Sequence, residues 1–438
     1  MAYYLPALQK PYMTIIRKLE AGNVPLPKAY SNWNELNWLD PRNPKFSYNH
    51  VLQSAGHVQL SDYSGNSEAM YRNAASNVTL VADSGGYQIG KNVDAWRGNW
   101  SDPNDSMAAA KRKQVYEWSQ LFDYAMTLDI PTWCQQPALN TPRKALDATC
   151  INNDWYIRQP NRKCKFLNTV QGKRQDRSAE YWLKEVSKYQ IQRTQDGFEG
   201  WAFADEHVRN PLLLIEQLLR LLKDNMLDNS WIHVLGIGRM SFAVLFYEIE
   251  NALRNIGINV TISFDSSSAS APMQYREIVL HSNSNGSLVS GRMLEARTGD
   301  TRTVKQAYTA QYGQFVDSPF TANVTMDELT NDEAYVTIAV AHYNWHQIKM
   351  VKSFYQQYDD TGLVHNLGES FEMRHELRAI FKNGYISDRA MELFKALQPN
   401  KLPQGIFVDD YAKQLMDVPR AAKQSDPVKL SPIYLQFR

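Results

Sequence analysis

The sequence Leu80-Val81-Ala82-Asp83-Ser84-Gly85-Gly86-Tyr87-Gln88-Ile89 runs from three apolar residues directly into a carboxylate, a hydroxyl group and two glycines. This order is typical of a buried parallel strand that ends in a tight turn at the rim of an active site. Because glycine has no Cβ, backbone amides at such a turn can approach a flat ligand closely. Asp83 would provide a fixed charge and Tyr87 a ring for stacking. An ordinary turn in which Asp83 and Ser84 cap the next helix gives the same local pattern.

The composition is that of an ordinary globular protein. The chain has 438 residues, of which 43% are hydrophobic and 21% charged, with a formal net charge of +1. This charge excludes a strongly basic shell, so any nucleic-acid-binding surface must be local. No apolar run approaches the ~20 residues that cross a bilayer, and residues 1–6 do not resemble a signal peptide. The cysteines, Cys134, Cys150 and Cys164, fit neither a disulfide framework nor a zinc knuckle, so we expect a reducing, cytoplasmic location.

Apolar strands alternate with amphipathic helices from residue 51 onward. They recur roughly every 30–45 residues, a spacing that suits a (β/α)8 TIM barrel, although a doubly wound sheet would give similar local patterns. Polar candidate residues directly follow the strands, on the face where barrel enzymes place their chemistry, and we therefore predict the barrel. The predicted strands are 51–57, 80–82, 124–130, 166–170, 198–204, 231–235, 260–264 and, for the eighth, 278–280.

The sequence predicts three parts. Residues 1–50 mix aromatic residues, prolines and asparagines without a sustained period, and we expect an N-terminal extension there. Residues 51–325 would form the α/β barrel domain, with a late polar insertion. Residues 326–438 would supply C-terminal helices, at 334–358 and 373–397, and a proline-containing tail packed on the barrel.

Asp83 to Gln88 resembles the D-S-G-G-[FY]-Q signature of the queuine/archaeosine tRNA-guanine transglycosylases, which exchange a guanine in nucleic acid for a 7-deazaguanine. The segment Phe264-Asp265-Ser266-Ser267-Ser268-Ala269 resembles the archaeal segment that carries the nucleophile. The resemblance implies that Asp265 attacks C1′ and that Asp83 is the general acid/base, in the manner of retaining glycosidases. Serines beside a strand-end Asp help to keep it ionised, although Asp265 could instead cap the following helix.

Further segments of the chain resemble the parts of the family that bind the base. Thr127-Leu128-Asp129-Ile130-Pro131-Thr132 resembles the archaeal L-D-I-P-T segment. Asp129 would accept hydrogen bonds from N1–H and the 2-amino group, a donor pair that guanine and 7-deazaguanines share. An Asp that begins a proline turn is the alternative. Val170-Gln171-Gly172 resembles the family's V-Q-G and implies that Gln171 contacts the base edge.

Two looser resemblances complete the predicted base pocket. Gly200 and Trp201 align with a glycine pair of the family, with Trp201 in the second position. Leu235-Gly236-Ile237-Gly238 resembles a turn in which Leu235 would face the base opposite Tyr87; taken without the other motifs, Leu235 would be assigned to the barrel core. The substrate contacts implied by the resemblance are Ser84, Tyr87, Asp129, Gln171, Gly200, Trp201, Leu235 and Gly236.

One departure from the family is large. Its members bind a structural zinc through C-x-C-x-x-C and a histidine, but this chain has no cysteine after Cys164. His342, in a segment similar to the one that holds the zinc histidine, cannot form the site alone. We therefore expect no metal or cofactor, and a zinc subdomain that is absent or held together by packing.

The nucleic acid is inferred from the same resemblance. Loss of the zinc cysteines, the aromatic N-terminal segment, the irregular tail and the lack of a C-terminal basic module are most like the phage and bacterial branch that puts 7-deazaguanines into DNA to evade restriction. The expected partners are DNA and a free 7-deazaguanine base such as preQ0, without a membrane, in the host cytoplasm if a phage encodes the chain. Lys173 and Arg174 are expected to bind phosphates.

Several alternatives stay open at the level of sequence. The same chemistry on tRNA is the nearest. A non-catalytic nucleic-acid-binding subunit belongs to another class, and would be expected to lack one of the two catalytic carboxylates. A carbohydrate glycosidase would explain paired acids but not the glycine turn with Asp129 and Gln171. Assembly as a homodimer is also left open.

Overall fold

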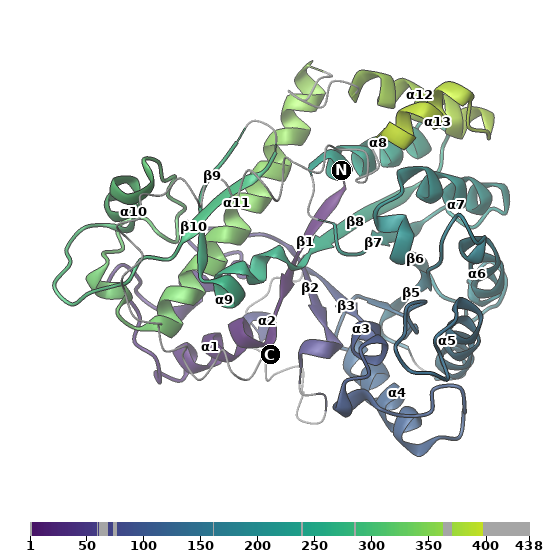
Figure 1. The fold of residues 1–438 in the computed structure, drawn as a ribbon, viewed down its shortest axis with the longest axis horizontal. Helices are drawn as coiled ribbons and strands as arrows, with labels where there is room; N and C mark the ends of the chain where they lie inside the picture. The colour runs from purple at the N-terminus through teal and green to yellow at the C-terminus, as the bar shows by residue number, and fades with distance from the viewer. Residues whose placement is uncertain are drawn as a thin grey trace.

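The computed structural model describes residues 2–58, 60, 69–72, 77–160, 162–237, 240–283, 286–361 and 370–396. Its centre is a closed barrel of parallel strands, in which each strand pairs with the next along the chain and β8 returns to β1 (Figure 1). The prediction of a TIM barrel is confirmed. The strands are β1 (Tyr3–Leu8), β2 (His50–Ser54), β3 (Thr79–Asp83), β4 (Tyr124–Met126), β5 (Lys165–Val170), β6 (Gly200–Phe203), β7 (Ser230–Val234) and β8 (Val260–Ser266).

Helices connect the strands and form the outer layer. Those between successive strands are α1 (Lys10–Glu20), α2 (Ala69–Arg72), α3 (Gly86–Gly90), α4 (Ser106–Ser119), α5 (Pro142–Ile157), α6 (Ser178–Val186), α7 (Pro211–Lys223) and α8 (Met240–Arg254). The long helix α11 (Asp332–Thr361) contacts both α8 and α1, so it completes the ring at the seam where β8 meets β1 (Figure 1). Within the described ranges, no helix is both long and apolar enough to cross a membrane.

A small subdomain separates β8 from α11. It consists of α9 (Ala271–Tyr275), the antiparallel pair β9 (Glu277–Ser282) and β10 (Leu288–Arg292), and α10 (Val304–Tyr312). In Figure 1 these elements lie beside α11, on the opposite side of the barrel from α4 to α7. After α11, helix α12 (Ser370–Asn383) packs on α8, and α13 (Asp388–Ala396) packs on α7. The predicted tail after residue 396 lies outside the described residues.

The structure corrects both ends of the predicted strand series. The first barrel strand is β1, which lies within the segment predicted to be an N-terminal extension. The predicted eighth strand at 278–280 is instead part of β9, in the separate two-stranded sheet. Pro6 explains why β1 was missed, because a proline argues against an internal strand. Residues Tyr3 to Pro6 pair with β8, while Ala7 and Leu8 pair with β2.

The barrel interior follows from alternation along each strand. Successive side chains point to opposite faces of a strand, so every second residue points to the barrel axis. One inward residue from each of β1 to β7 forms a single apolar cluster, made of Leu5, Leu52, Val81, Met126, Leu167, Ala202 and Trp231. Burial of such a side chain contributes about 1.5–3 kcal/mol. Asp83 lies two positions beyond Val81, and therefore points to the axis above this layer.

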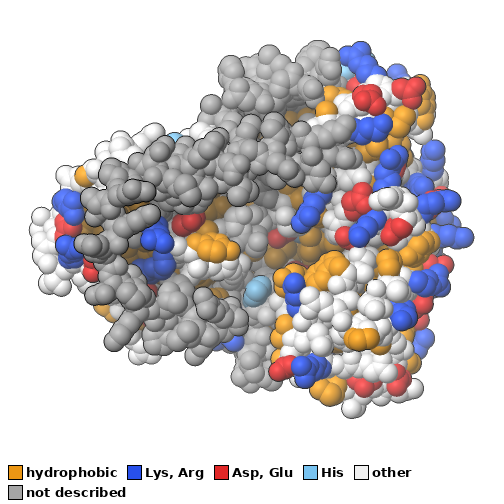
Figure 2. Space-filling model, viewed as in Figure 1, with side chains coloured by type: hydrophobic (Ala, Val, Ile, Leu, Met, Phe, Trp, Pro, Cys, Tyr) orange, Lys and Arg blue, Asp and Glu red, His pale blue; other side chains and the backbone are white. Residues whose placement is uncertain are grey.

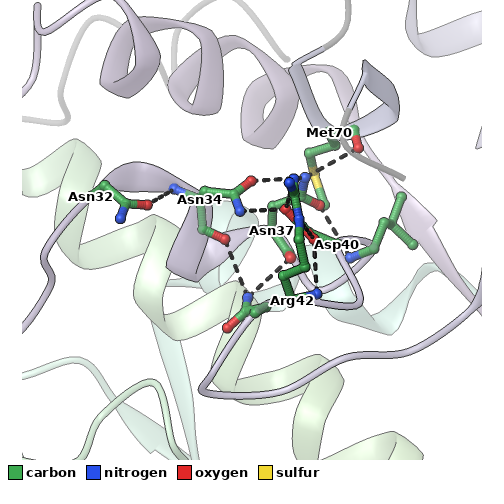
Figure 3. A network of polar contacts seen from close by, with 8 residues as sticks. Asn32, Asn34, Asn37, Asp40, Arg42 and Met70 are labelled. Atoms are coloured by element: carbon green, nitrogen blue, oxygen red, sulfur yellow. Dashed lines mark hydrogen bonds and ion pairs between the residues drawn. The ribbon is translucent and has the colours of Figure 1, made fainter. Parts of the chain in front are cut away.

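A polar network holds the long connection between α1 and β2 (Figure 3). Asp40 accepts two hydrogen bonds from the Arg42 guanidinium, at 2.8 and 3.0 Å, and one from Asn34 at 2.6 Å. The Arg42 hydrogen bonds lower the pKa of Asp40 to about 2. Asn37 donates to the carbonyl oxygen of Met70 at 3.1 Å and so ties this loop to α2. The network fixes an otherwise irregular segment against the barrel.

Candidate active site

Three carboxylates lie at the C-terminal ends of the barrel strands. Asp83 ends β3, Asp265 is the penultimate residue of β8, and Asp129 follows β4. Burial raises the pKa of Asp83, and the charge of Asp265 raises it further. Burial also raises the pKa of Asp129 to about 7, with a further contribution from the charge of Asp83. The structure therefore brings these three predicted residues close enough to interact electrostatically.

Asp265 is held by two donors on one oxygen. The backbone N–H of Gly236 lies 2.7 Å from Asp265 Oδ1, and His233 Nε2 lies 3.2 Å from the same atom. Gly236 reaches this position with φ of +70°, a conformation that favours glycine. Within the described part of the chain, no hydrogen bond is made to Oδ2. The carboxylate is thus fixed through Oδ1.

His233 was not predicted as a site residue, yet it connects Asp265 to the barrel interior. The imidazole is fully buried, and its Nδ1 lies 2.8 Å from Ser263 Oγ. Trp231 Nε1, which can only donate, lies 2.7 Å from the same hydroxyl oxygen. Ser263 can therefore donate its own proton to His233 Nδ1, and in that tautomer His233 Nε2 donates to Asp265. The available signal was an imidazole at an inward position of an apolar strand, since buried polar groups need partners.

Asp83 has different surroundings from Asp265. It accepts a hydrogen bond from the backbone N–H of Gly85 at 3.3 Å and one from the side chain of Ser54. His57, which was not predicted either, lies nearby: burial lowers the pKa of this imidazole, and the charge of Asp83 opposes that effect. Asp83 therefore holds its proton more tightly than an ordinary Asp does, as a proton carrier requires.

The residues predicted to bind the base edge form a continuous network. Ser84 Oγ donates to Asp129 Oδ1 at 3.1 Å, and Gln171 Nε2 donates to Asp129 Oδ2. The Gln171 amide oxygen in turn accepts from the backbone N–H of Thr132 at 3.1 Å. A Cβ at Gly86 would lie 2.6 Å from the carbonyl oxygen of Asp129, so the glycine turn packs directly against this residue. Each carboxylate oxygen has a second lone pair, which leaves Asp129 able to accept from a ligand.

A fourth carboxylate near this edge was not predicted. Asp205 follows β6 and accepts a hydrogen bond from Thr132 Oγ1. Its backbone has φ of +57°, and burial raises the pKa of its carboxyl group. The signal was available, because Asp205 follows a predicted strand in the same manner as Asp83 does.

Tyr87 and Leu235 both follow the C-terminal ends of barrel strands. Tyr87 is the second residue of α3 and is 57% exposed, so its ring is open to a ligand. Leu235 follows β7, is half-buried and packs on the apolar cluster of the barrel interior. Gly236 also lies at the site, but its N–H is directed to Asp265.

Gly200 and Trp201 do not lie with the other predicted substrate contacts. They are the first residues of β6, at the end of the barrel opposite to Asp83 and Asp265. Trp201 is fully buried among the side chains between the strands and the outer helices, and its Nε1 donates to the carbonyl oxygen of Met226 at 3.0 Å. A Cβ at Gly200 would lie 2.3 Å from the carbonyl oxygen of Trp231. The prediction for this pair is wrong, and both residues are structural.

The two predicted phosphate contacts differ in whether an acidic side chain already pairs with them. Arg174 forms an ion pair with Glu216 on α7, with hydrogen bonds from both Nε and Nη2, so its charge is already compensated. Lys173 is exposed, and its charge partly counters the raised pKa of Asp205. On the face in Figure 2, Lys and Arg side chains are intermixed with Asp and Glu over the half that holds α4 to α7.

The zinc site of the resembling family does not fit these residues. His342 Nδ1 lies 2.8 Å from Ser318 Oγ, and its Nε2 lies 2.8 Å from the carbonyl oxygen of Val279. Both nitrogens are therefore engaged, and the ring stacks on Phe315. Among the described side chains, no group of three or more His, Cys, Asp or Glu is arranged to hold a metal ion. Packing and hydrogen bonds hold this subdomain to α11.

Comparison with known proteins adds nothing to these geometric observations. No protein-family model matches the chain, and neither does any curated protein sequence.

Proposed function

We propose that the protein is a transglycosylase that replaces guanine in DNA with a 7-deazaguanine derivative through a covalent Asp265–sugar intermediate. The observation that carries the proposal is the convergence of Asp83, Asp129 and Asp265 at one mouth of the barrel, with interacting charges. The three have different environments, and two titratable groups that differ in this way suit an acid/base and a nucleophile.

The exchange takes place in two halves. Asp265 Oδ2 attacks C1′, the C1′–N9 bond breaks, and its electron pair remains on the departing guanine, which takes a proton from Asp83. The N9 atom of the incoming 7-deazaguanine then attacks C1′, gives its proton to Asp83 and releases the Asp265 carboxylate. The two hydrogen bonds to Oδ1 orient Asp265, while the raised pKa of Asp83 favours its role as a proton donor.

Asp129 supplies the selectivity for the base. Its two oxygens are oriented by Ser84 and Gln171, and in the ionised form they accept from N1–H and the 2-amino group. Adenine and the pyrimidines lack this donor pair, so they would leave the remaining lone pairs of the buried carboxylate without donors. The target guanine must be extruded from its stack to reach both Asp129 and Asp265.

The direct test is incorporation of radiolabelled 7-deazaguanine into either duplex DNA or bulk tRNA by the full-length protein. We expect label in DNA; label in tRNA alone would favour the alternative polymer, and label in neither would contradict the proposal. Without an incoming base, the parent protein should retain labelled DNA on a denaturing gel.

The Asp265→Asn variant separates an enzyme from a non-catalytic nucleic-acid-binding subunit. It should neither form the adduct nor incorporate label, because the amide is a poor nucleophile. The matched control is Asp94→Asn, which changes an exposed Asp paired with Arg97 and should behave like the parent. An Asp265→Asn protein as active as the parent would contradict the mechanism.

A further inference from the structure

Two large aromatic side chains and a lysine lie together on the rim beside Asp129. Tyr87 comes from α3 and is 57% exposed; Trp133 comes from the segment after β4 and is 41% exposed. Their rings meet edge to face with centroids 5.4 Å apart. Lys91 Nζ lies 5.7 Å from the Tyr87 centroid and 5.6 Å from the Trp133 centroid. Both rings stay exposed although the ammonium lies over them.

The backbone beneath these side chains is fixed. The N–H of Gln135 donates to the carbonyl oxygen of Gly90 at 2.9 Å, and Gln136 Nε2 donates to that of Ile89 at 3.2 Å. These contacts join α3 to the segment that carries Trp133. A Cβ at Gly90 would lie 2.7 Å from the Trp133 ring, so the glycine leaves the space in which the indole rests. The indole is therefore held in place without being buried.

Large exposed aromatic side chains are uncommon on a protein surface and mark binding sites when they gather. Proteins that bind single-stranded nucleic acid combine aromatic rings, on which bases stack, with cations that meet the phosphates. Trp133 and Lys91 provide both, next to the residue that would read the target base. Tyr87 would remain for the target base itself.

We propose that Trp133 and Lys91 bind the unpaired nucleotide that flanks the target guanine in DNA. The neighbouring base stacks on the exposed indole, and its phosphate pairs with the Lys91 ammonium. This inference rests on the proposed function for the identity of the polymer. It adds the requirement that the DNA be locally single-stranded beyond the extruded base.

The test is fluorescence anisotropy of the full-length protein with a labelled single-stranded DNA oligonucleotide that contains one guanine. Trp133→Ala should weaken binding about 5- to 150-fold, the equivalent of about 1–3 kcal/mol for one stacked base. Trp133→Phe should retain most of the affinity. Lys91→Ala should reduce the slope of the logarithm of the binding constant against the logarithm of the salt concentration by about 0.7, which is the contribution of one phosphate contact on a single strand.

The matched control is Tyr385→Ala, which removes an exposed aromatic side chain, 62% exposed, between α12 and α13. It should bind like the parent. Binding of the free 7-deazaguanine base, measured by calorimetry, should be unchanged in Trp133→Ala, which also shows that the variant is folded.

The outcomes separate the two proposals. Oligonucleotide binding that does not depend on Trp133, or that is undetectable in the parent, would overturn the inference, as would dependence seen with RNA but not with DNA. Loss of oligonucleotide binding in Trp133→Ala, together with no label incorporation into any polymer, would support nucleotide binding by Trp133 and Lys91 and contradict the proposed transglycosylase activity.

Discussion

The two ends of the barrel use the same inward-facing positions in opposite ways. At the N-terminal end, Tyr3 stacks on His50 with centroids 4.0 Å apart, and Trp231 packs against Tyr124 at 4.4 Å and Tyr3 at 6.3 Å. At the C-terminal end, the corresponding positions carry carboxylates and hydroxyl groups. One end is closed by rings, and the other presents charge.

The difference indicates that one end of the barrel mainly stabilises the fold and the other mainly carries the chemistry. Stacked rings bury apolar surface and favour the folded state, whereas buried carboxylates oppose it because burial disfavours the charged form. Such unfavourable groups are expected where a reaction requires them. The two ends are not independent, since Trp231, Ser263 and His233 form a hydrogen-bonded chain from the rings to Asp265. Substitutions along the barrel axis test whether each end affects stability and activity separately.

The largest effect is expected at the charged end. Asp83→Asn should lower the rate of base exchange about 10²–10⁴-fold, the usual contribution of a general acid/base. Its stability should not fall. Because the pKa of Asp83 is raised in the folded state, the folded protein binds this proton more tightly than the unfolded chain does. The free energy of unfolding of the parent therefore falls as the pH rises above the pKa of Asp83 in the unfolded chain. The variant avoids that loss. Label incorporation and thermal unfolding at pH 6 and 8 provide the measurements.

A variant that was both inactive and much less stable would contradict the separation, because it would make Asp83 a structural residue.

The closed end should show the reverse behaviour. Trp231→Ala removes a buried indole and should lower the free energy of unfolding by about 3–5 kcal/mol, as large-to-small substitutions in a core do. Trp133→Ala removes the same side chain from the exposed rim, and should change stability by no more than about 0.5 kcal/mol. Urea unfolding of the two variants gives the comparison, and equal losses would show that the rings do not act as a core.

Much of this organisation could be predicted from strand ends in the sequence. Asp83, Asp129 and Asp265 each follow a recognisable apolar run, and the parallel barrel brings such ends together. The first strand was missed because β1 contains a proline. The predicted series therefore began at β2, and its eighth strand was assigned to residues that belong to β9.

The errors within the site have another cause. Short motifs do not say which end of a strand they occupy. Gly200 and Trp201 were assigned to the base pocket, but they begin β6, and alternation points Trp201 outward to the helices. Inward or outward parity would have excluded Trp201, whereas Asp205 lies beyond the last residue of β6 and could be suggested only by its place after the strand. The partners of His233 could not be inferred, since they lie on a different strand.

The connection between the two ends should have an intermediate effect. His233→Phe fills the same buried space but removes one donor from Asp265 Oδ1. Loss of a hydrogen bond to a charged group is worth about 1.5–3 kcal/mol, so we expect kcat about 10- to 150-fold lower with KM nearly unchanged. Ser263→Ala acts one step further away and should have a smaller effect in the same direction. If His233→Phe raised KM alone, the histidine would not position the nucleophile.

The smallest effect, and the most specific one, concerns pH. Since burial raises the pKa of Asp129 to about 7, the carboxyl is largely protonated below that pH and can then accept only weakly from N1–H and the 2-amino group. Affinity for a free 7-deazaguanine base should therefore fall about tenfold per pH unit below 7 and level off above it. Asp129→Asn should bind weakly at every pH, without this slope. Calorimetry between pH 5.5 and 8.5 measures both, and a parent affinity independent of pH would mean that Asp129 does not read the base.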